Sequence, residues 1–347
     1  MILVRKLRLA PGEDAYALRA RAAKKLRLPC AEVKELTLIK RSLDARHKDD
    51  IHYVCSAALS VSGDERRVIA RVKSPDVCEY TPPEYSVARV SPGEGAPRPV
   101  IAGFGPAGMF AALVLSMAGA RPIVIERGRD ALSRKAAVDA FRAGGALDTE
   151  CNVQFGEGGA GTFSDGKLNT GTHDARLFWV LRQFYAHGAP ESVLYDAKPH
   201  IGTDILIDVV QRIRADVIAR GGEVRFSTRL ERLIIENGAL TGIEVHDAQG
   251  LHTLPCTQLI LAIGHSARDT FEALHAQGVP MEPKPFSMGV RIEHRQCDID
   301  LAQYGTARGA LPAADYSLNV RLPDGRSAYT FCMCPGGEVF AAASESG

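Results

Sequence analysis

Apolar and polar positions divide the 347-residue chain into three stretches of different periodicity. The first stretch, residues 1–92, predicts a small α+β module, because residues 3–9 read as a strand and residues 13–26 repeat apolar positions at helical spacing. Two further apolar runs, residues 33–39 and 51–61, predict strands on either side of a charged connection, residues 40–50. Residues 91–99 are rich in Pro and Gly and predict a linker.

The second stretch, residues 97–268, has the order of elements of a Rossmann-like α/β domain with a parallel sheet. Strands are expected at 100–102, 123–125 and 224–226, with helices ending near Ala118 and Ala219. Residues 230–235, 241–245 and 251–254 predict a β-meander. Residues 259–263 predict a buried strand that returns to the parallel sheet, and Ser266-x-x-Asp269 predicts a capping box that opens the next helix.

The third stretch, residues 269–347, contains strand-like runs at 286–292, 316–322 and 328–333, with a hairpin turn at Asp324-Gly325. We interpret it as the start of an antiparallel substrate domain. Because the chain ends at Gly347 in strand-and-turn sequence, we expect this domain to be partial. Cys332 and Cys334 are two residues apart, so both thiols would share one face of a strand. That spacing fits either a redox relay to a cofactor or two structural thiols.

Composition limits the class of protein. Hydrophobic residues make up 46% of the chain and charged residues 24%, and the net charge of +1 creates no global field that would attract nucleic acid or a membrane. The first ten residues contain three basic side chains and lack the apolar core of a secretory signal. Eight scattered cysteines fit a reducing compartment. We therefore expect a cytoplasmic protein with a small-molecule substrate, no membrane partner and no metal site.

The N-terminal module is basic, with 18 Lys or Arg against 12 Asp or Glu over residues 1–90. Four of the basic residues crowd the charged connection, namely Lys40, Arg41, Arg46 and Lys48. This pattern fits an RNA- or anion-binding appendage. It also fits a solvated hairpin loop, which we favour because three aspartates are interleaved with the basic residues and no aromatic stacking platform accompanies them.

A glycine motif, Gly103-x-Gly105-x-x-Gly108, lies between the first strand and the first helix of the α/β domain. Gly103 permits a tight turn, Gly105 lets the backbone approach a pyrophosphate, and Gly108 allows close packing of helix and strand. The helix N-terminus then presents amide groups and a positive dipole to the phosphates. Glu126 ends the second strand 23 residues after Gly103, where a carboxylate binds ribose hydroxyls. Strand, turn, helix, strand and acid in this order predict a dinucleotide site.

This run, extended through Ala112, Gly119 and Glu126-Arg127-Gly128, resembles the FAD fingerprint of the glutathione-reductase-like flavoproteins. Residues 152–168, 261–268 and 331–337 are similar to a bacterial group of NAD(P)/FAD-dependent dehydrogenases. The resemblance implies FAD as the cofactor and a backbone contact from the region of Leu230 to the adenine. It implies no particular substrate.

A second glycine-rich segment, residues 156–166, has five glycines among eleven residues. It lies in an irregular stretch of about 30 residues, within a predicted Gly-rich insertion at 142–200. Its amides could lie along the pyrophosphate and the flavin edge. His265 fits a pyrophosphate neighbour, a flavin-facing acid or a structural histidine. The complete predicted set of cofactor-binding residues is Gly103, Gly105, Pro106, Ala107, Gly108, Glu126, Arg127, Arg134, Gly158, Gly159, Ala160, Gly161, Thr162, Ser164, Asp165, Leu230, Ala262, Gly264 and His265.

The function we expect is an FAD-dependent oxidoreductase in which the bound flavin carries the hydride and protein residues supply binding and electrostatics. No second complete glycine motif follows, so NAD(P)H would act as a transient electron donor at most. Two alternatives remain open. One is a flavin-bearing RNA-binding or RNA-modifying protein that uses the basic module, and the other is a thiazole-synthase-like protein that uses NAD on the same fold. The pattern indicates neither a catalytic acid or base nor an oligomeric state.

Overall fold

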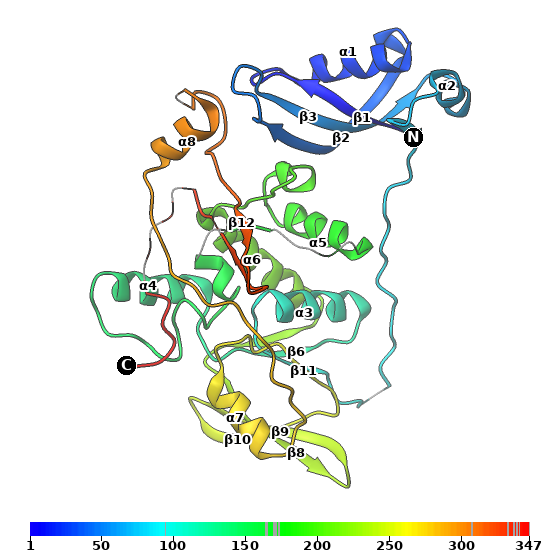
Figure 1. The fold of residues 1–347 in the computed structure, drawn as a ribbon. Coiled ribbons are helices and arrows are strands. Elements are labelled where there is room, and N and C mark those ends of the chain that lie inside the picture. The colour runs from blue at the N-terminus through cyan, green and yellow to red at the C-terminus, as the bar shows by residue number, and fades with distance from the viewer. Residues whose placement is uncertain are drawn as a thin grey trace.

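The computed structural model describes residues 1–347 except residues 94, 164, 165, 169–171, 173, 307, 332, 336, 338, 340 and 347. It is a mixed α/β structure with one parallel sheet and three antiparallel sheets among these described residues. Figure 1 shows the N-terminal module in blue beside a central α/β domain in cyan, green and yellow, with the orange and red C-terminal segment along one side.

The N-terminal module follows a βαββαβ order. Its elements are β1 (Ile2–Leu9), α1 (Ala15–Leu26), η1 (Cys30–Glu32), β2 (Val33–Asp44), β3 (His52–Val61), α2 (Glu65–Val72) and β4 (Val77–Glu79). The strands pair antiparallel in the order β2-β3-β1-β4, which is the ferredoxin-like arrangement. Fully buried apolar side chains such as Ile2, Leu26 and Leu59 join this sheet to its helices.

Two features of this module differ from the sequence prediction. Residues 40–44 belong to β2, so Lys40 and Arg41 lie in a strand and the turn between β2 and β3 is shorter than expected. The helix α2 was not predicted, although Asp64 caps its first turn through Arg66 N and Arg67 N. Only two of its eight residues, Val68 and Val72, are buried, and this weak apolar pattern explains why the helix was missed.

The central domain has three layers. The parallel sheet has the order β11-β5-β6-β7, formed by β5 (Val100–Ala102), β6 (Ile123–Ile125), β7 (Glu223–Arg225) and β11 (Leu259–Leu261). Alternate side chains face opposite layers: Ile101 and Val124 join the core beneath the helices, whereas Val100 and Ile125 join the core beneath the meander. The helical elements are α3 (Pro106–Ala118), α4 (Ala131–Arg142), η2 (Ala160–Phe163), α5 (Ala175–Ala186), η3 (Glu191–Leu194) and α6 (Thr203–Ala219).

The β-meander covers the other face of the parallel sheet, as the pattern predicts. It consists of β8 (Arg229–Glu236), β9 (Ala239–Asp247) and β10 (Gly250–Pro255), joined in the order β10-β9-β8. The turn after β8 uses Asn237 and Gly238, both with positive φ, as a tight hairpin requires.

Two predictions at the end of this domain are wrong. The returning strand β11 ends at Leu261, and its Ile260 and Leu261 are 39% and 43% exposed rather than buried, because β11 is the edge strand of the sheet. The helix α7 (Arg268–Ala276) begins without the predicted capping box. Ser266 Oγ instead donates to Gln154 Oε1, and the Asp269 carboxylate pairs with Arg127.

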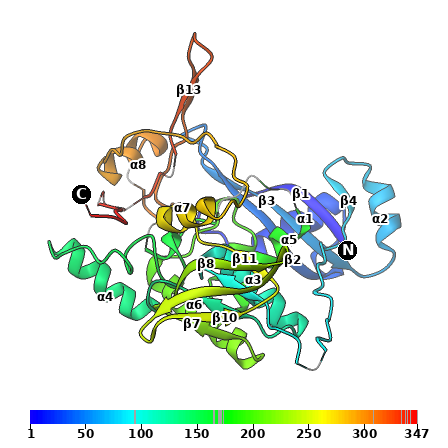
Figure 2. The same ribbon diagram turned by 90° about the horizontal axis from the view of Figure 1, so that it is seen from below.

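The C-terminal segment contains less regular structure than predicted. Its elements are α8 (Gln296–Tyr304), which was not predicted, and the hairpin β12 (Asn319–Arg321) and β13 (Ser327–Tyr329). Gly325 has a positive φ in the expected turn, and Figure 2 shows the hairpin projecting from the body of the molecule. The strand predicted at 286–292 is absent; Phe286 and Val290 are 82% and 90% exposed, and no neighbouring described strand pairs with them.

Two further expectations concern single features of the chain. Of the predicted cysteine pair, Cys332 lies outside the described residues and Cys334 is half-buried. Within the described part of the chain, every helix is too short or too polar to cross a bilayer.

Candidate cofactor site

The first glycine motif forms a turn that leaves no room for side chains. Gly103 has a φ of +100°, and a Cβ atom there would overlap the carbonyl oxygen of Ala262. A Cβ atom on Gly108 would overlap the carbonyl oxygen of Gly103. Both glycines therefore let β5, β11 and the start of α3 approach one another, as the motif predicts.

The second glycine-rich segment meets the first one face to face. A Cβ atom on Gly159 would lie 3.0 Å from Gly105 Cα and 3.0 Å from Pro106 Cδ. Gly158 N donates to Phe104 O over 2.9 Å, which fastens the second segment to the turn of the first. The two segments, far apart in the sequence, thus form adjoining walls of one site.

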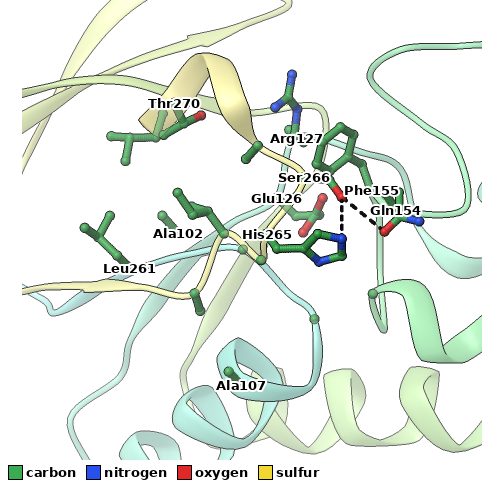
Figure 3. Close-up of a pocket in the computed structure, with 18 of the residues that line it drawn as sticks. Ala102, Ala107, Glu126, Arg127, Gln154, Phe155, Leu261, His265, Ser266 and Thr270 are labelled. Atoms are coloured by element: carbon green, nitrogen blue, oxygen red, sulfur yellow. Dashed lines mark hydrogen bonds between the residues drawn. The ribbon is translucent and has the colours of Figure 1, made fainter. Parts of the chain in front are cut away.

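A cavity of about 710 Å³ opens at this junction, within the size range of small-molecule and cofactor sites. Its walls come from the carboxyl ends of the parallel strands, both glycine-rich segments, β8 and α7. Figure 3 shows Glu126, Gln154 and Ser266 grouped toward one side, with Leu261 and Thr270 toward the other. A site at the carboxyl edge of a parallel sheet is where α/β domains bind their ligands.

Most of the predicted cofactor-binding residues line this cavity: Gly103, Gly105, Pro106, Ala107, Glu126, Arg127, Gly159, Ala160, Gly161, Leu230, Ala262, Gly264 and His265. Four others, Gly108, Arg134, Gly158 and Thr162, are not among its lining residues and lie behind the loops that form it. The predicted contacts Ser164 and Asp165 lie outside the described residues.

Glu126 holds the three loops of the site together. It is 5% exposed, and its carboxylate accepts hydrogen bonds from Phe104 N at 2.7 Å and from Gly128 N and Gly156 N at 2.9 Å each. Glu126 also borders the cavity, where the glycine motif predicts that its carboxylate binds the ribose of the dinucleotide. Its contacts in this structure are all to the backbone, so a role in loop geometry accompanies the predicted ribose contact.

Arg127 closes the neighbouring wall. Its guanidinium donates two hydrogen bonds to Asp269 at 2.9 Å each and two to Glu150 at 3.0 and 3.1 Å, and it stacks 4.2 Å from the centre of the Phe155 ring. Burial alone would lower the pKa of Arg127. The hydrogen bonds from Arg127 to Asp269 and Glu150 outweigh this effect, so the pKa of Arg127 is raised. Arg127 therefore stays cationic and ties α7 to the central domain.

Arg134 acts beneath the cavity rather than in it. The side chain is fully buried and donates to the carbonyl oxygens of Asn152, Val153 and Glu157 at 2.7 to 2.8 Å. It stacks 4.6 Å from the centre of the Phe163 ring, and burial lowers its pKa to about 10. The structure thus gives Arg134 a positioning role in place of direct ligand contact.

Glu157, also beneath the loop, was not predicted. Its side chain is fully buried, and Oε2 accepts a hydrogen bond from Ala131 N at the start of α4 over 2.8 Å. Burial raises the pKa of Glu157, although Arg214 lies 3.4 Å from Oε1. Sequence offered only one signal for it, a charged residue placed between glycines.

His265 is exposed at the rim of the cavity. Its Nε2 lies 3.3 Å from Ser266 Oγ, which in turn donates to Gln154 Oε1 (Figure 3). Gln154 and Ser266 lie in the segments 152–168 and 261–268 but were not predicted as cavity residues, because Ser266 was assigned to a capping box and Gln154 precedes the glycines of its segment. The other missed wall residues come mainly from β8, α7 and the segment after it: Thr228, Arg229, Thr270, Phe271, Leu274, Val279, Pro280 and Met281.

The residues fit an anionic dinucleotide that carries flat, apolar rings. The helix α3 begins at Pro106, which has no N–H. The amide of the next residue, Ala107, lacks an intrahelical partner, as at every helix start, and Ala107 borders the cavity. A Cβ atom on the cavity-lining Gly161 would meet no atom within 4 Å, so the space beside Gly161 is available to a ligand. Leucine, isoleucine, proline and methionine side chains on the other walls suit an aromatic ring.

Comparison with known proteins gives matches to two domain models and to one relative that is aligned over the whole of this chain. Residues 285–347 match the model described as "FAD-dependent protein, C-terminal domain-like", and residues 1–60 match a domain of unknown function, DUF8436. An uncharacterized protein of Clostridium beijerinckii is 42% identical over 349 residues, which covers 100% of this chain. The chain spans 64% of the length of that relative.

Among solved structures, the chain is similar to Thermovibrio ammonificans THI4, with 16% identity, a TM-score of 0.35 and coverage of 53% of this chain and 64% of that one. It is also similar to the glycerol-3-phosphate dehydrogenase from Bacillus halodurans complexed with FAD, with 14% identity, a TM-score of 0.33 and coverage of 52% and 36%. Likenesses this slight carry no argument about function. The domain match at 285–347 supports a connection of this chain to FAD-dependent proteins.

Proposed function

We propose that this chain binds FAD in the cavity between its two glycine-rich segments and works as an FAD-dependent oxidoreductase. The observation that carries the proposal is the meeting of Gly105 and Gly159 at the N-terminus of α3. Two backbone walls without side chains, next to a helix N-terminus, suit a pyrophosphate group.

Residues of this chain would hold each part of the cofactor. Backbone amides at the start of α3, beginning with Ala107, would bind the pyrophosphate, Glu126 would accept from the ribose, and the backbone near Leu230 would contact the adenine. When bound, FAD supplies the acceptance and donation of hydride. The protein contributes position, exclusion of water and the loop geometry that Glu126 and Arg127 maintain. NAD(P)H as electron donor is part of the proposal, and the substrate is a small molecule of undetermined class.

A titration of the purified chain with FAD, followed by flavin fluorescence, tests this proposal. Gly105→Val is the informative variant, because Gly105 has an ordinary φ of −73° and a Cβ there meets Gly159 Cα at 3.6 Å, an ordinary contact. The variant should lose FAD affinity by at least tenfold, since the atoms beyond its Cβ extend toward Gly159, where the two glycine-rich segments meet. Gly93→Val, in the linker with open space around Gly93, is the matched control. Equal FAD affinity in both variants would contradict the assignment.

The same titration with NAD separates the two dinucleotides. Saturable binding of NAD with no binding of FAD would favour the thiazole-synthase-like alternative. Binding of FAD that requires the intact glycine segments supports the oxidoreductase.

A further inference from the structure

A specific seam joins the N-terminal module to the central domain at β2. Arg41 N donates to Tyr195 O at 2.8 Å, and Ala197 N donates to Arg41 O at 2.9 Å. The Arg41 guanidinium also donates to both carboxylate oxygens of Asp196, at 2.7 and 2.9 Å. Backbone and side chain of one residue therefore hold the same three-residue segment, where β2 of the module lies next to the green part of the central domain in Figure 1.

The surroundings of Arg41 strengthen this seam. Its guanidinium lies 5.2 Å from the ring centre of Tyr53 in the module and 5.0 Å from that of Tyr195 in the central domain. Arg41 and Asp196 side chains are only 31% and 28% exposed. A bidentate, partly buried and stacked arginine makes a stronger and more directional contact than an exposed ion pair.

Other arginines of the module make contacts of a different kind. Arg46 pairs with Asp44, two residues away in the same hairpin, and Arg21 pairs with Glu13. These pairs stay inside the module, whereas the Arg41 pair reaches 155 residues along the chain. Arg41 is thus placed to transmit the position of the module to the central domain.

The residues that follow the segment held by Arg41 pair with the end of the second glycine-rich segment. Leu168 N donates to Pro199 O at 3.0 Å, and Ile201 N donates to Gly166 O at 2.9 Å. A Cβ atom on Gly166 would overlap the carbonyl oxygen of Ile201, so the two strands of chain are in close contact. Ile201 is fully buried. The end of the second glycine-rich segment and the residues just after it are therefore paired with residues 199–201, which directly follow the segment that Arg41 holds.

From there the contacts reach the cavity through two side chains. Phe163 belongs to the same hydrophobic core as Ile201, and its ring is stacked by the guanidinium of Arg134. Arg134 in turn binds the carbonyl oxygens of residues 152, 153 and 157, directly before the cavity-lining Gly159. The route from Arg41 to the cavity thus combines hydrogen bonds, one cation–π contact, the continuous chain from residue 197 to residue 199 and a hydrophobic core that Phe163 and Ile201 share.

We propose that the N-terminal module acts as a clamp in cis, which uses the Arg41–Asp196 seam to hold the second glycine-rich segment in its ligand-binding shape. The clamp assigns a role to the domain at residues 1–60. It rests on the proposed function, because the ligand whose affinity it sets is FAD. Arg41 and Asp196 are positioning residues, since neither lines the cavity.

The test compares FAD affinity in Arg41→Ala, Asp196→Ala, the double variant and Arg41→Lys, with Arg46→Ala as the matched control. Each alanine variant should weaken FAD binding roughly tenfold, the scale of one lost hydrogen-bonded charge pair. The double variant should be no weaker than either single variant, because both remove the same contact. Arg41→Lys, which keeps the charge and loses the fork, should fall between. Arg46→Ala should bind as the parent chain does.

Amide hydrogen exchange over residues 152–163, measured without ligand, gives a second readout that is independent of FAD. Arg41→Ala should raise exchange there relative to Arg46→Ala. If the parent chain and Arg41→Ala bind FAD with the same affinity, the clamp is refuted and the proposed function stands. A parent chain that binds no FAD refutes the proposed function, and equal exchange in the two variants then refutes the clamp as well.

Discussion

Replacing Glu126 by alanine should destabilise the central domain strongly. The Glu126 carboxylate accepts three hydrogen bonds from buried backbone amides, at 2.7, 2.9 and 2.9 Å. A hydrogen bond to a charged group contributes about 1.5 to 3 kcal/mol, and a buried amide left unpaired costs about 1 to 3 kcal/mol. Because the three bonds share one carboxylate, their losses are not additive. We expect Glu126→Ala to lower the free energy of unfolding by about 3 to 5 kcal/mol.

Urea unfolding followed by Trp179 fluorescence measures this loss. Trp179 is the only tryptophan of the chain and packs against the core of the central domain in α5, so it reports on this domain. With a urea dependence of about 1 to 3 kcal/mol per molar, the midpoint should fall by more than 1 M. Glu126→Gln keeps one carbonyl acceptor and turns an NH₂ group toward a backbone amide, so an intermediate loss of about 2 kcal/mol is expected. A loss under about 1 kcal/mol for Glu126→Ala would refute this reasoning.

The ribose contact makes a second, separable prediction for the same residue. In variants that remain folded, loss of the carboxylate should weaken FAD binding by about 1.5 to 3 kcal/mol, measured by fluorescence titration. Unfolding in the absence of FAD reports on the loops alone, whereas affinity reports on loops and ligand together. Unchanged affinity in a folded Glu126→Gln variant would remove the ribose contact from the account.

Three further predictions concern packing, burial and reactivity. Gly108→Ala should lower the thermal midpoint by several degrees, because its Cβ would overlap the carbonyl oxygen of Gly103. Gly161→Ala, with open space around Gly161, should leave the midpoint unchanged. Equal midpoints in the two variants would contradict the close packing assigned to Gly108. Burial raises the pKa of Glu157, so its folded form holds a proton more tightly than the unfolded form does. The parent chain should therefore lose stability relative to Glu157→Gln as pH rises from the ordinary glutamate pKa toward the raised one, and a pH-independent difference in urea midpoints would contradict this. Exposed Cys297 should react with a thiol reagent before buried Cys256, whose pKa is raised by burial; mass spectrometry of labelled peptides would reveal the opposite order.

The sequence predicted those parts of the fold whose local pattern and tertiary role coincide. The strand, glycine turn and helix from residue 100 to 118 lie where expected, because Gly103 and Gly108 are required by backbone contacts that any residue with a side chain would block. The β-meander was predicted for a similar reason, since apolar alternation and the Asn237-Gly238 turn agree.

Prediction failed where the role of a residue depends on distant partners. Arg134 was expected at the ligand, yet its bonds go to carbonyls of residues 152–157, which no local pattern reveals. Asp269 has the spacing of a capping box, but both of its carboxylate oxygens accept hydrogen bonds from Arg127. The helix α7 therefore begins without a side-chain cap. Apolar alternation at 286–292 predicted a strand, and alternation alone does not provide a partner strand.

The central claim is that the cavity binds FAD. It is tested most directly by the visible absorption spectrum of the chain, purified from cells supplied with riboflavin. Chromatography of the nucleotide that heat releases then identifies the cofactor. We predict flavin absorption bands and release of FAD at close to one molecule per chain, both lost in Gly105→Val and kept in Gly93→Val. A colourless chain that also takes up no added FAD, or one that releases NAD alone, would contradict the claim that this cavity binds FAD.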